Sequence, residues 1–261
     1  MITRRAALAL PALLAGAPAR AATIAGRAEQ GGMLLGAAAP GQRVTLDGTA
    51  LRVSPAGRFV FGFGRDHGPS ATLRVDGVAR SLEVARREWP VQHITGLPPA
   101  QVTPDAATLA RIRTERERLA AVRGADTARE AFAAPLAWPA RGRISGVFGS
   151  QRILNGEPRQ PHYGLDVAGP VGTPILAALA GRVTLAAEFV FFGRLLVLDH
   201  GHGVNTLYAH LDAIEVHEGA EVAQGARIAT MGATGRVTGP HLHFSLSWFR
   251  TWLDPQPLLP G

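Results

Sequence analysis

The sequence predicts a mainly β protein, because short runs of β-favouring residues alternate with turn signals along most of its 261 residues. The chain contains 31 Gly and 19 Pro, and Asp-Gly pairs follow predicted strands at 47–48 and 76–77. A charged helical pattern interrupts this series once, before the second β-rich segment. We therefore expect a small β-sandwich-like domain at 22–92, a linker with a helix at 93–134 and an all-β domain at 135–261.

The first 21 residues predict an export signal. Arg4 and Arg5 form a short cationic start, residues 6–17 are apolar, and Ala19-Arg20-Ala21 is a small-x-small cleavage site. The apolar run is too short to span a bilayer, and no later segment predicts a span. We expect export by the Sec or the twin-arginine route, with no stable membrane insertion after cleavage.

The N-terminal domain is predicted from short strands that end in turn residues. These strands are expected at residues 43–46, 51–53, 58–63 and 71–75. Four or more strands of this length form a small sandwich or barrel. Asp66-His67 lies in a Gly-rich loop and predicts a turn without catalytic function. A binding or positioning module, or a simple spacer, is the expected role.

A helix is predicted after the linker at 96–99. Thr103-Pro104-Asp105 marks its start, with Thr103 as N-cap and Pro104 in the first turn, and Gly124 marks its end. Leu109, Ile112, Arg116, Leu119 and Val122 follow helical spacing along one face. Such a helix can bridge domains, cover an active site or contact a partner, and the sequence leaves these three roles open.

The C-terminal domain is predicted from a second series of strand patterns. These lie at residues 143–150, 174–178, 181–185, 195–199, 203–209 and 227–232, without a long helix between them. Residues 151–161 contain Asn155-Gly156 and two prolines, so we expect an exposed loop on the rim of the site to which His162 belongs.

Charge and cysteine content limit the function. The net charge of +7 suits a polyanionic environment, but no dense basic run or RNA-binding aromatic pattern is present, so we expect no nucleic-acid partner. All 27 basic residues are Arg. Because the chain has no Cys, any metal must be bound by His and carboxylate side chains.

Histidines concentrate in the C-terminal domain, with seven of nine between His162 and His243. On an extended segment, His241 and His243 project from the same face. A straight strand would place the α-carbons of His162 and Asp166 ~13 Å apart, so the chain must bend at Gly164 for both to reach one ion.

A catalytic zinc site has three protein ligands and an open fourth position. Five candidates are present, namely His162, Asp166, His210, His241 and His243. Two imidazoles are therefore left for acid and base catalysis. Ligand counting alone does not say which two.

Three motifs in this order resemble the M23 zinc metallopeptidases, the lysostaphin/LytM-type peptidoglycan endopeptidases. The motifs are His162-x-x-x-Asp166, Tyr208-Ala209-His210-Leu211 and Gly239-Pro240-His241-Leu242-His243, within a resemblance that spans residues 138–257. The resemblance implies one Zn²⁺ per chain, bound by His162, Asp166 and His243. It also implies that His241 transfers protons and that His210 donates to the oxyanion.

The same resemblance implies hydrolysis of peptide cross-links in peptidoglycan stems, and with the export signal it predicts a periplasmic protein. Ser245 stands where many relatives have Glu. Whether direct D-amino-acid cross-links or glycyl bridges are cut stays open, as does the oligomeric state. His200, His202 and His217 are expected in surface turns, outside the site.

Two other functions stay open for such a chain, and a third is excluded. The first is a catalytically silent LytM-like scaffold or activator of another wall hydrolase. The second is a wall-binding protein without catalysis. The third comes from residues 219–228, which resemble the turn of lipoyl and biotinyl carrier domains, but the chain has no lysine to modify.

Overall fold

The structure is a computed structural model that describes residues 22–96, 98 and 102–261. The predicted export signal at 1–21 lies outside the described residues, as does part of the predicted linker at 96–99. Strands dominate the described chain, so the predicted fold class is confirmed. In the described ranges, no helix combines the length and apolar composition needed to cross a membrane.

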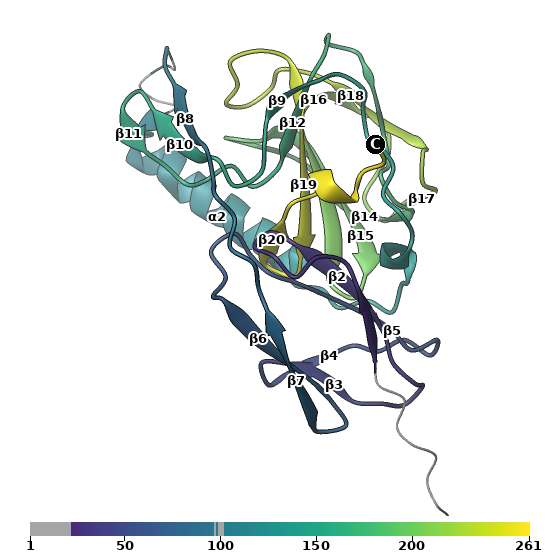
Figure 1. Cartoon of the computed structure of the whole chain (residues 1–261). Helices are drawn as coiled ribbons and strands as arrows, with labels where there is room; N and C mark the ends of the chain where they lie inside the picture. The colour runs from purple at the N-terminus through teal and green to yellow at the C-terminus, as the bar shows by residue number, and fades with distance from the viewer. Residues whose placement is uncertain (1–21, 97, 99–101) are drawn as a thin grey trace, which may run out of the picture.

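The N-terminal strands form two facing sheets (Figure 1). One contains β1 (Thr23–Ala25), β2 (Met33–Ala37) and β5 (Arg58–Gly62) in the order β1-β2-β5. The other contains β3 (Val44–Leu46), β4 (Thr49–Leu51), β6 (Ser70–Val75) and β7 (Val78–Glu83) in the order β4-β3-β6-β7. Phe59, Phe61 and Leu73 belong to the shared core, as the alternating pattern of the strands predicts.

The N-terminal sheet is docked on the C-terminal domain through the second face of β5. Val60, which alternates with Phe59 and Phe61, packs in a cluster with Leu246 and Leu253. The β5 main chain lies so close to the Leu253 side chain that a Cβ at Gly62 would lie 2.7 Å from the Leu253 methyl groups. Both faces of β5 are therefore buried, and the two β regions share a hydrophobic interface.

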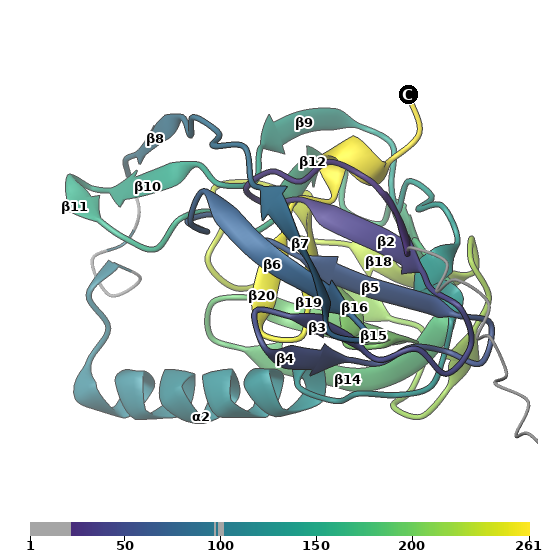
Figure 2. The ribbon, with the colours of Figure 1, turned by 60° about the horizontal axis from the view of Figure 1, so that its bottom comes forward.

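Helix α2 (Ala106–Arg123) packs beside the C-terminal sheet (Figure 2). Asp105, not the expected Thr103, is its N-cap, and the Asp105 carboxylate accepts from the Thr108 amide at 2.7 Å. Asp is as good an N-cap as Thr, and here the residue directly before the helix keeps the extended conformation that a cap requires. Gly124 ends the helix as predicted.

The predicted apolar face of α2 is only partly buried. Leu119 packs against Phe189 and Leu207 of the C-terminal sheet, and Ile112 is also buried. Leu109 remains 49% exposed, and Arg116 is exposed. The part of this face that carries Leu109 and Arg116 therefore lies over a cleft, which is described below as the candidate site.

Residues 151–161 do not form the expected loop. They contain β10 (Gln151–Leu154) and β11 (Glu157–Pro158), an antiparallel hairpin whose turn is Asn155-Gly156, both with positive φ. A distant strand, β8 (Val91–Ile94), pairs with β10 in parallel register. The local turn signals were visible in the sequence. The strand that pairs with β10 lies about 60 residues earlier, so local patterns do not indicate the small sheet that the two strands form.

The C-terminal domain is one large sheet with the central order β17-β14-β15-β16-β19-β12-β9. Its strands are β9 (Arg143–Gly146), β12 (Leu165–Ala168), β13 (Pro174–Leu176), β14 (Gly181–Phe189), β15 (Gly193–Gly201), β16 (Val204–Ile214), β17 (Glu221–Val222), β18 (Arg227–Met231), β19 (His241–Trp248) and β20 (Thr251–Leu253). Short 3₁₀ turns lie at Ala131–Ala133 and Gln256–Leu258. The core on one face of this sheet includes Val167, Leu242 and Phe244.

Candidate active site

Strand register brings the motif residues together. Antiparallel pairing of β12 with β19 places Asp166 opposite His243 and Ala168 opposite His241. Leu242 points the other way and is fully buried in the core, as the alternation predicts. The chain before β12 bends so that His162 reaches the same place from a neighbouring loop.

The side chains of His162, Asp166 and His243 converge on one point. Asp166 Oδ1 lies 3.0 Å from His162 Nε2 and 2.8 Å from His243 Nδ1. The two imidazole nitrogens are 2.9 Å apart. All three residues are buried, and within the described chain they form a group able to hold a metal ion.

The hydrogen bonds on the far sides of the two rings fit a metal. His162 Nδ1 donates to the Val147 carbonyl at 3.0 Å, so its Nε2 presents a lone pair. When His243 Nε2 donates to Ser245 Oγ at 2.8 Å, His243 Nδ1 also presents a lone pair. Two lone pairs and a carboxylate oxygen at these separations repel one another, and all three can lie about 2.1 Å from a shared zinc ion.

Asp166 is held as an anion. Burial would raise the pKa of this carboxyl, but interaction with His162 and His243 outweighs burial and holds the pKa well below its usual value. Arg152, which the sequence did not single out, lies 3.2 Å from the other carboxylate oxygen, Oδ2. Its position in a segment expected to be a loop gave no signal of this contact.

Two glycines leave room for these side chains. A Cβ at position 164 would lie 2.6 Å from His243 Cε1 and 2.8 Å from Ser245 Oγ. A Cβ at Gly146 would lie 2.4 Å from Asp166 Oδ2. The chain does bend at Gly164 as expected. The decisive property of this glycine is its missing side chain, because its φ is outside the left-handed region.

His210 and His241 lie next to this group. The rings of His210 and His241 have centroids 4.7 Å apart, and His241 Nε2 is 3.9 Å from Asp166 Oδ1. His210 has φ 62°, a conformation rare outside glycine, and its backbone amide donates to the Phe192 carbonyl. A strained, tethered backbone therefore fixes the direction of the His210 ring.

Both of these imidazoles are tethered through Nδ1. His210 Nδ1 donates to the Thr234 carbonyl at 2.9 Å, and His241 Nδ1 donates to the Gly239 carbonyl at 2.8 Å. Each neutral ring therefore offers Nε2 as a proton acceptor. Burial, followed by the charges of His243 and His241, lowers the pKa of His210 to about 3, and burial lowers that of His243 to about 4.

The remaining C-terminal histidines lie elsewhere. His217 is exposed, as expected. His202 does sit in the β15–β16 turn, but it is buried against the Phe132 ring with centroids 4.5 Å apart. His200 is fully buried, with Nδ1 and Nε2 each 2.7 Å from the Ala180 carbonyl and Thr206 Oγ1. The surface prediction was wrong for both because segments 127–133 and 178–180 cover the hairpin.

A cleft of about 480 Å³ opens onto His162, His210 and His243. One wall is α2, which contributes Leu109 and Leu119, and another is the β10–β11 hairpin. Of the three roles left open for the helix, lining the site is the one that the structure supports. Residues missed by the sequence reasoning include Arg123, Arg236, Tyr163 and Trp252, which also line this cleft.

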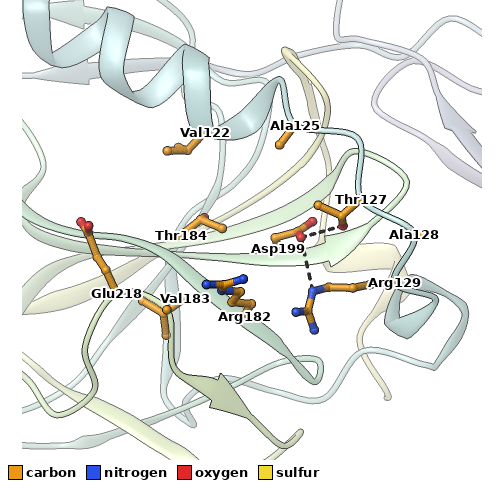
Figure 3. A pocket seen from close by; sticks show the side chains of 11 residues that line it. Val122, Ala125, Thr127, Ala128, Arg129, Arg182, Val183, Thr184, Asp199 and Glu218 are labelled. Atoms are coloured by element: carbon orange, nitrogen blue, oxygen red, sulfur yellow. Dashed lines mark hydrogen bonds and ion pairs between the residues drawn. The ribbon is translucent and has the colours of Figure 1, made fainter.

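A second hollow, of about 960 Å³, lies between the C-terminal end of α2 and strands β14 and β15 (Figure 3). Two of its polar side chains bind Asp199: Thr127 donates to the Asp199 carboxylate at 2.7 Å, and Arg129 lies 3.6 Å from the same carboxylate. None of its lining residues belongs to the predicted motifs.

Comparison with known proteins agrees with this geometry. Peptidoglycan DD-endopeptidase ShyA from Vibrio cholerae is 42% identical over 105 residues, which cover 40% of this chain and 24% of ShyA. Murein hydrolase activator NlpD from Escherichia coli is 34% identical over 47% of this chain and 31% of NlpD. The matches thus span about a quarter to a third of these relatives.

One solved structure is similar over most of the chain. It is a Pseudomonas aeruginosa protein assigned to peptidase M23, with 26% identity and a TM-score of 0.65 over 88% of this chain and 93% of that protein. Residues 160–255, which contain all five candidate side chains, match the model described as peptidase family M23. Residues 160–255 therefore form a domain of the peptidase family M23 type.

Proposed function

We propose that this chain is an exported zinc metalloendopeptidase that hydrolyses peptide cross-links of peptidoglycan. The observation that carries the proposal is the convergence of His162 Nε2, Asp166 Oδ1 and His243 Nδ1 within 3.0 Å of one another. Two further imidazoles beside that point supply proton transfer. The similarity to peptidoglycan DD-endopeptidase ShyA supports the substrate class.

His162, Asp166 and His243 would hold one Zn²⁺, which would supply a Lewis acid for the scissile carbonyl and acidify a water molecule. Arg152 keeps Asp166 oriented through Oδ2, leaving Oδ1 for the ion. The carbonyl of Val147 and the hydroxyl of Ser245 keep the two ligand rings in the required tautomers.

His241 is the proposed proton carrier. Its Nδ1 proton is committed to the Gly239 carbonyl, so Nε2 accepts the proton of the attacking water and later donates it to the leaving amine. His210 donates to the oxyanion only in its protonated form. Burial disfavours that form in the resting site, so Nε2 would take its proton from solvent water in the cleft as negative charge develops on the substrate oxygen.

The remaining assignments of the sequence are part of the same proposal. Residues 1–21 serve as a cleaved export signal, which places the mature protein in the periplasm. Residues 22–92 form the N-terminal β domain, 93–134 the helical linker and 135–261 the peptidase domain with one ion per chain.

Incubation of the full chain with purified peptidoglycan tests the proposal. Zinc-loaded protein is expected to release new amino groups, a chelator is expected to stop the release, and added zinc is expected to restore it. Absence of release from zinc-loaded protein would overturn the proposal.

A second candidate is a noncatalytic activator of another wall hydrolase, supported by the 34% identity to murein hydrolase activator NlpD. It predicts that the chain stimulates a separate amidase or endopeptidase and that the chelator does not affect this stimulation. The complete donor group favours the enzyme.

A further inference from the structure

Arginines surround the candidate active site. Five of them line the cleft: Arg116 and Arg123 from α2, Arg152 and Arg159 from residues 151–161, and Arg236 from the segment before β19. We call these five residues the guanidinium set. None of the described residues that line the same cleft is Asp or Glu.

Arg123 is the most deeply placed member. It is 6% exposed, its guanidinium lies 3.3 Å from the centre of the Trp252 ring, and its Nε donates to Ser247 Oγ. Its Nη2 is buried without a hydrogen-bond partner among the described residues. A buried cation with an unused donor is costly, and an anion entering the cleft would satisfy it.

The cations of the set also affect one another. Arg152 uses Nη2 on Asp166, but its Nε is buried without a partner in the described chain. Burial, followed by the charges of Arg152, Arg159 and Arg116, lowers the pKa of Arg236 to about 10. Arg123 and Arg236 stay protonated at neutral pH, so the cleft carries an excess of positive charge.

Several arginines outside the cleft bind a carboxylate closely. Arg129 binds Glu221 at 2.6 Å, Arg227 binds Glu215 at 2.6 Å, and Arg52 binds Asp126 at 2.7 Å. Within the cleft, Arg159 approaches Glu157 only at 3.6 Å. Arg123 differs from these three arginines, because it has no carboxylate partner in the described chain although it is buried.

We propose that the guanidinium set binds a free carboxylate of the substrate close to the scissile amide. This inference rests on the proposed peptidase function and specifies its substrate. In a direct cross-link, the amide nitrogen belongs to a diamino acid that also carries a carboxylate, whereas a glycyl bridge is uncharged along its length. The set therefore selects direct cross-links over glycyl bridges.

Matched synthetic substrates test this selection. The first pair is a direct cross-linked peptide whose diamino-acid carboxylate is either free or a carboxamide. The second pair is a linear peptide whose leaving residue ends in a carboxylate or a carboxamide, so that the two pairs distinguish a side-chain carboxylate from a C-terminal one. The same peptides are also titrated calorimetrically into chelator-treated protein, which gives binding without turnover.

The variants are Arg116→Gln and Arg123→Gln, with Arg113→Gln as control. Arg113 is exposed on the same helix and does not line the cleft, so its substitution removes the same charge at nearly the same place. Arg116 is also exposed, which protects the test if Arg123→Gln fails to fold. Preference is expressed as the ratio of kcat/KM for the carboxylate to that for the carboxamide.

Wild-type protein and Arg113→Gln are expected to prefer the carboxylate by about tenfold or more in at least one pair, because charge-assisted hydrogen bonds have about this strength. Arg116→Gln and Arg123→Gln are expected to bring the ratio toward one, and salt is expected to weaken the preference. Equal turnover of both members of both pairs by wild type would overturn the inference while leaving the peptidase function intact. No turnover of any peptide would instead count against the peptidase, and calorimetry would then decide on carboxylate binding alone.

Discussion

Ser245 gives the sharpest prediction about how the metal ligands are held. Ser245 is 1% exposed, and its hydroxyl lies 2.8 Å from His243 Nε2, on the side of the ring opposite Asp166. The change Ser245→Ala leaves the buried Nε2 without this partner. It also removes the contact that keeps Nδ1 free of a proton and available to the ion.

The expected size follows from that single lost hydrogen bond. An unsatisfied buried donor costs about 1–3 kcal/mol, and removing the hydrogen-bond partner of a metal-binding histidine lowers metal affinity by about 10–100-fold. Zinc affinity is measured by competition with a chromogenic chelator, and the stability of chelator-treated protein by urea unfolding. Ser81→Ala, which makes the same change on an exposed strand, is the matched control.

A Ser245→Ala protein that binds zinc as tightly as wild type would refute this reasoning. It would show that the tautomer of His243 is set by Asp166 or by the ion itself.

Three further predictions concern other parts of the site and the core. His243→Ala is expected to lose zinc, whereas His241→Ala keeps zinc and loses turnover; metal analysis and amine release on the same samples distinguish the two. Gly164→Ala is expected to destabilise the protein by about 1–3 kcal/mol and to weaken zinc binding, because its Cβ would lie 2.6 Å from His243 Cε1, and thermal unfolding with and without zinc measures both effects. Burial lowers the pKa of His200 to about 4, below its usual value in the unfolded chain. As the pH drops from about 6.5 toward 4, the unfolded state therefore takes up the proton first, and the free energy of unfolding falls. The loss approaches about 3 kcal/mol, and His200→Gln in chelator-treated protein is expected to show a shallower decline in urea unfolding between these pH values. A decline equal to that of wild type would contradict the assignment.

The sequence predicted the elements that depend on local patterns. Alternation predicted that His241 and His243 share a face and that Leu242 enters the core, and the pairing of β12 with β19 confirms both. Glycine and proline punctuation predicted the end of α2 at Gly124. These features depend on a few neighbouring residues, so a short stretch of sequence contains enough information for them.

Contacts between distant segments could not be predicted in this way. Arg152 reaches Asp166 only because β8 and β10 fold the hairpin toward the site. His200 looked like a surface turn residue, and it is buried because residues around Ala180 pack over it. In each case the partner comes from a separate part of the chain, and no periodicity within the segment indicates it.

The second buried face of β5 has a practical consequence for anyone dividing the chain. Removing residues 22–92 would expose Leu246 and Leu253 to water, since Val60 and Met33 cover them in the intact protein. A fragment cut at the predicted boundary before residue 135 is therefore expected to aggregate or to require detergent, even though it keeps every candidate metal ligand. The N-terminal strands therefore keep the C-terminal domain soluble by covering its apolar surface.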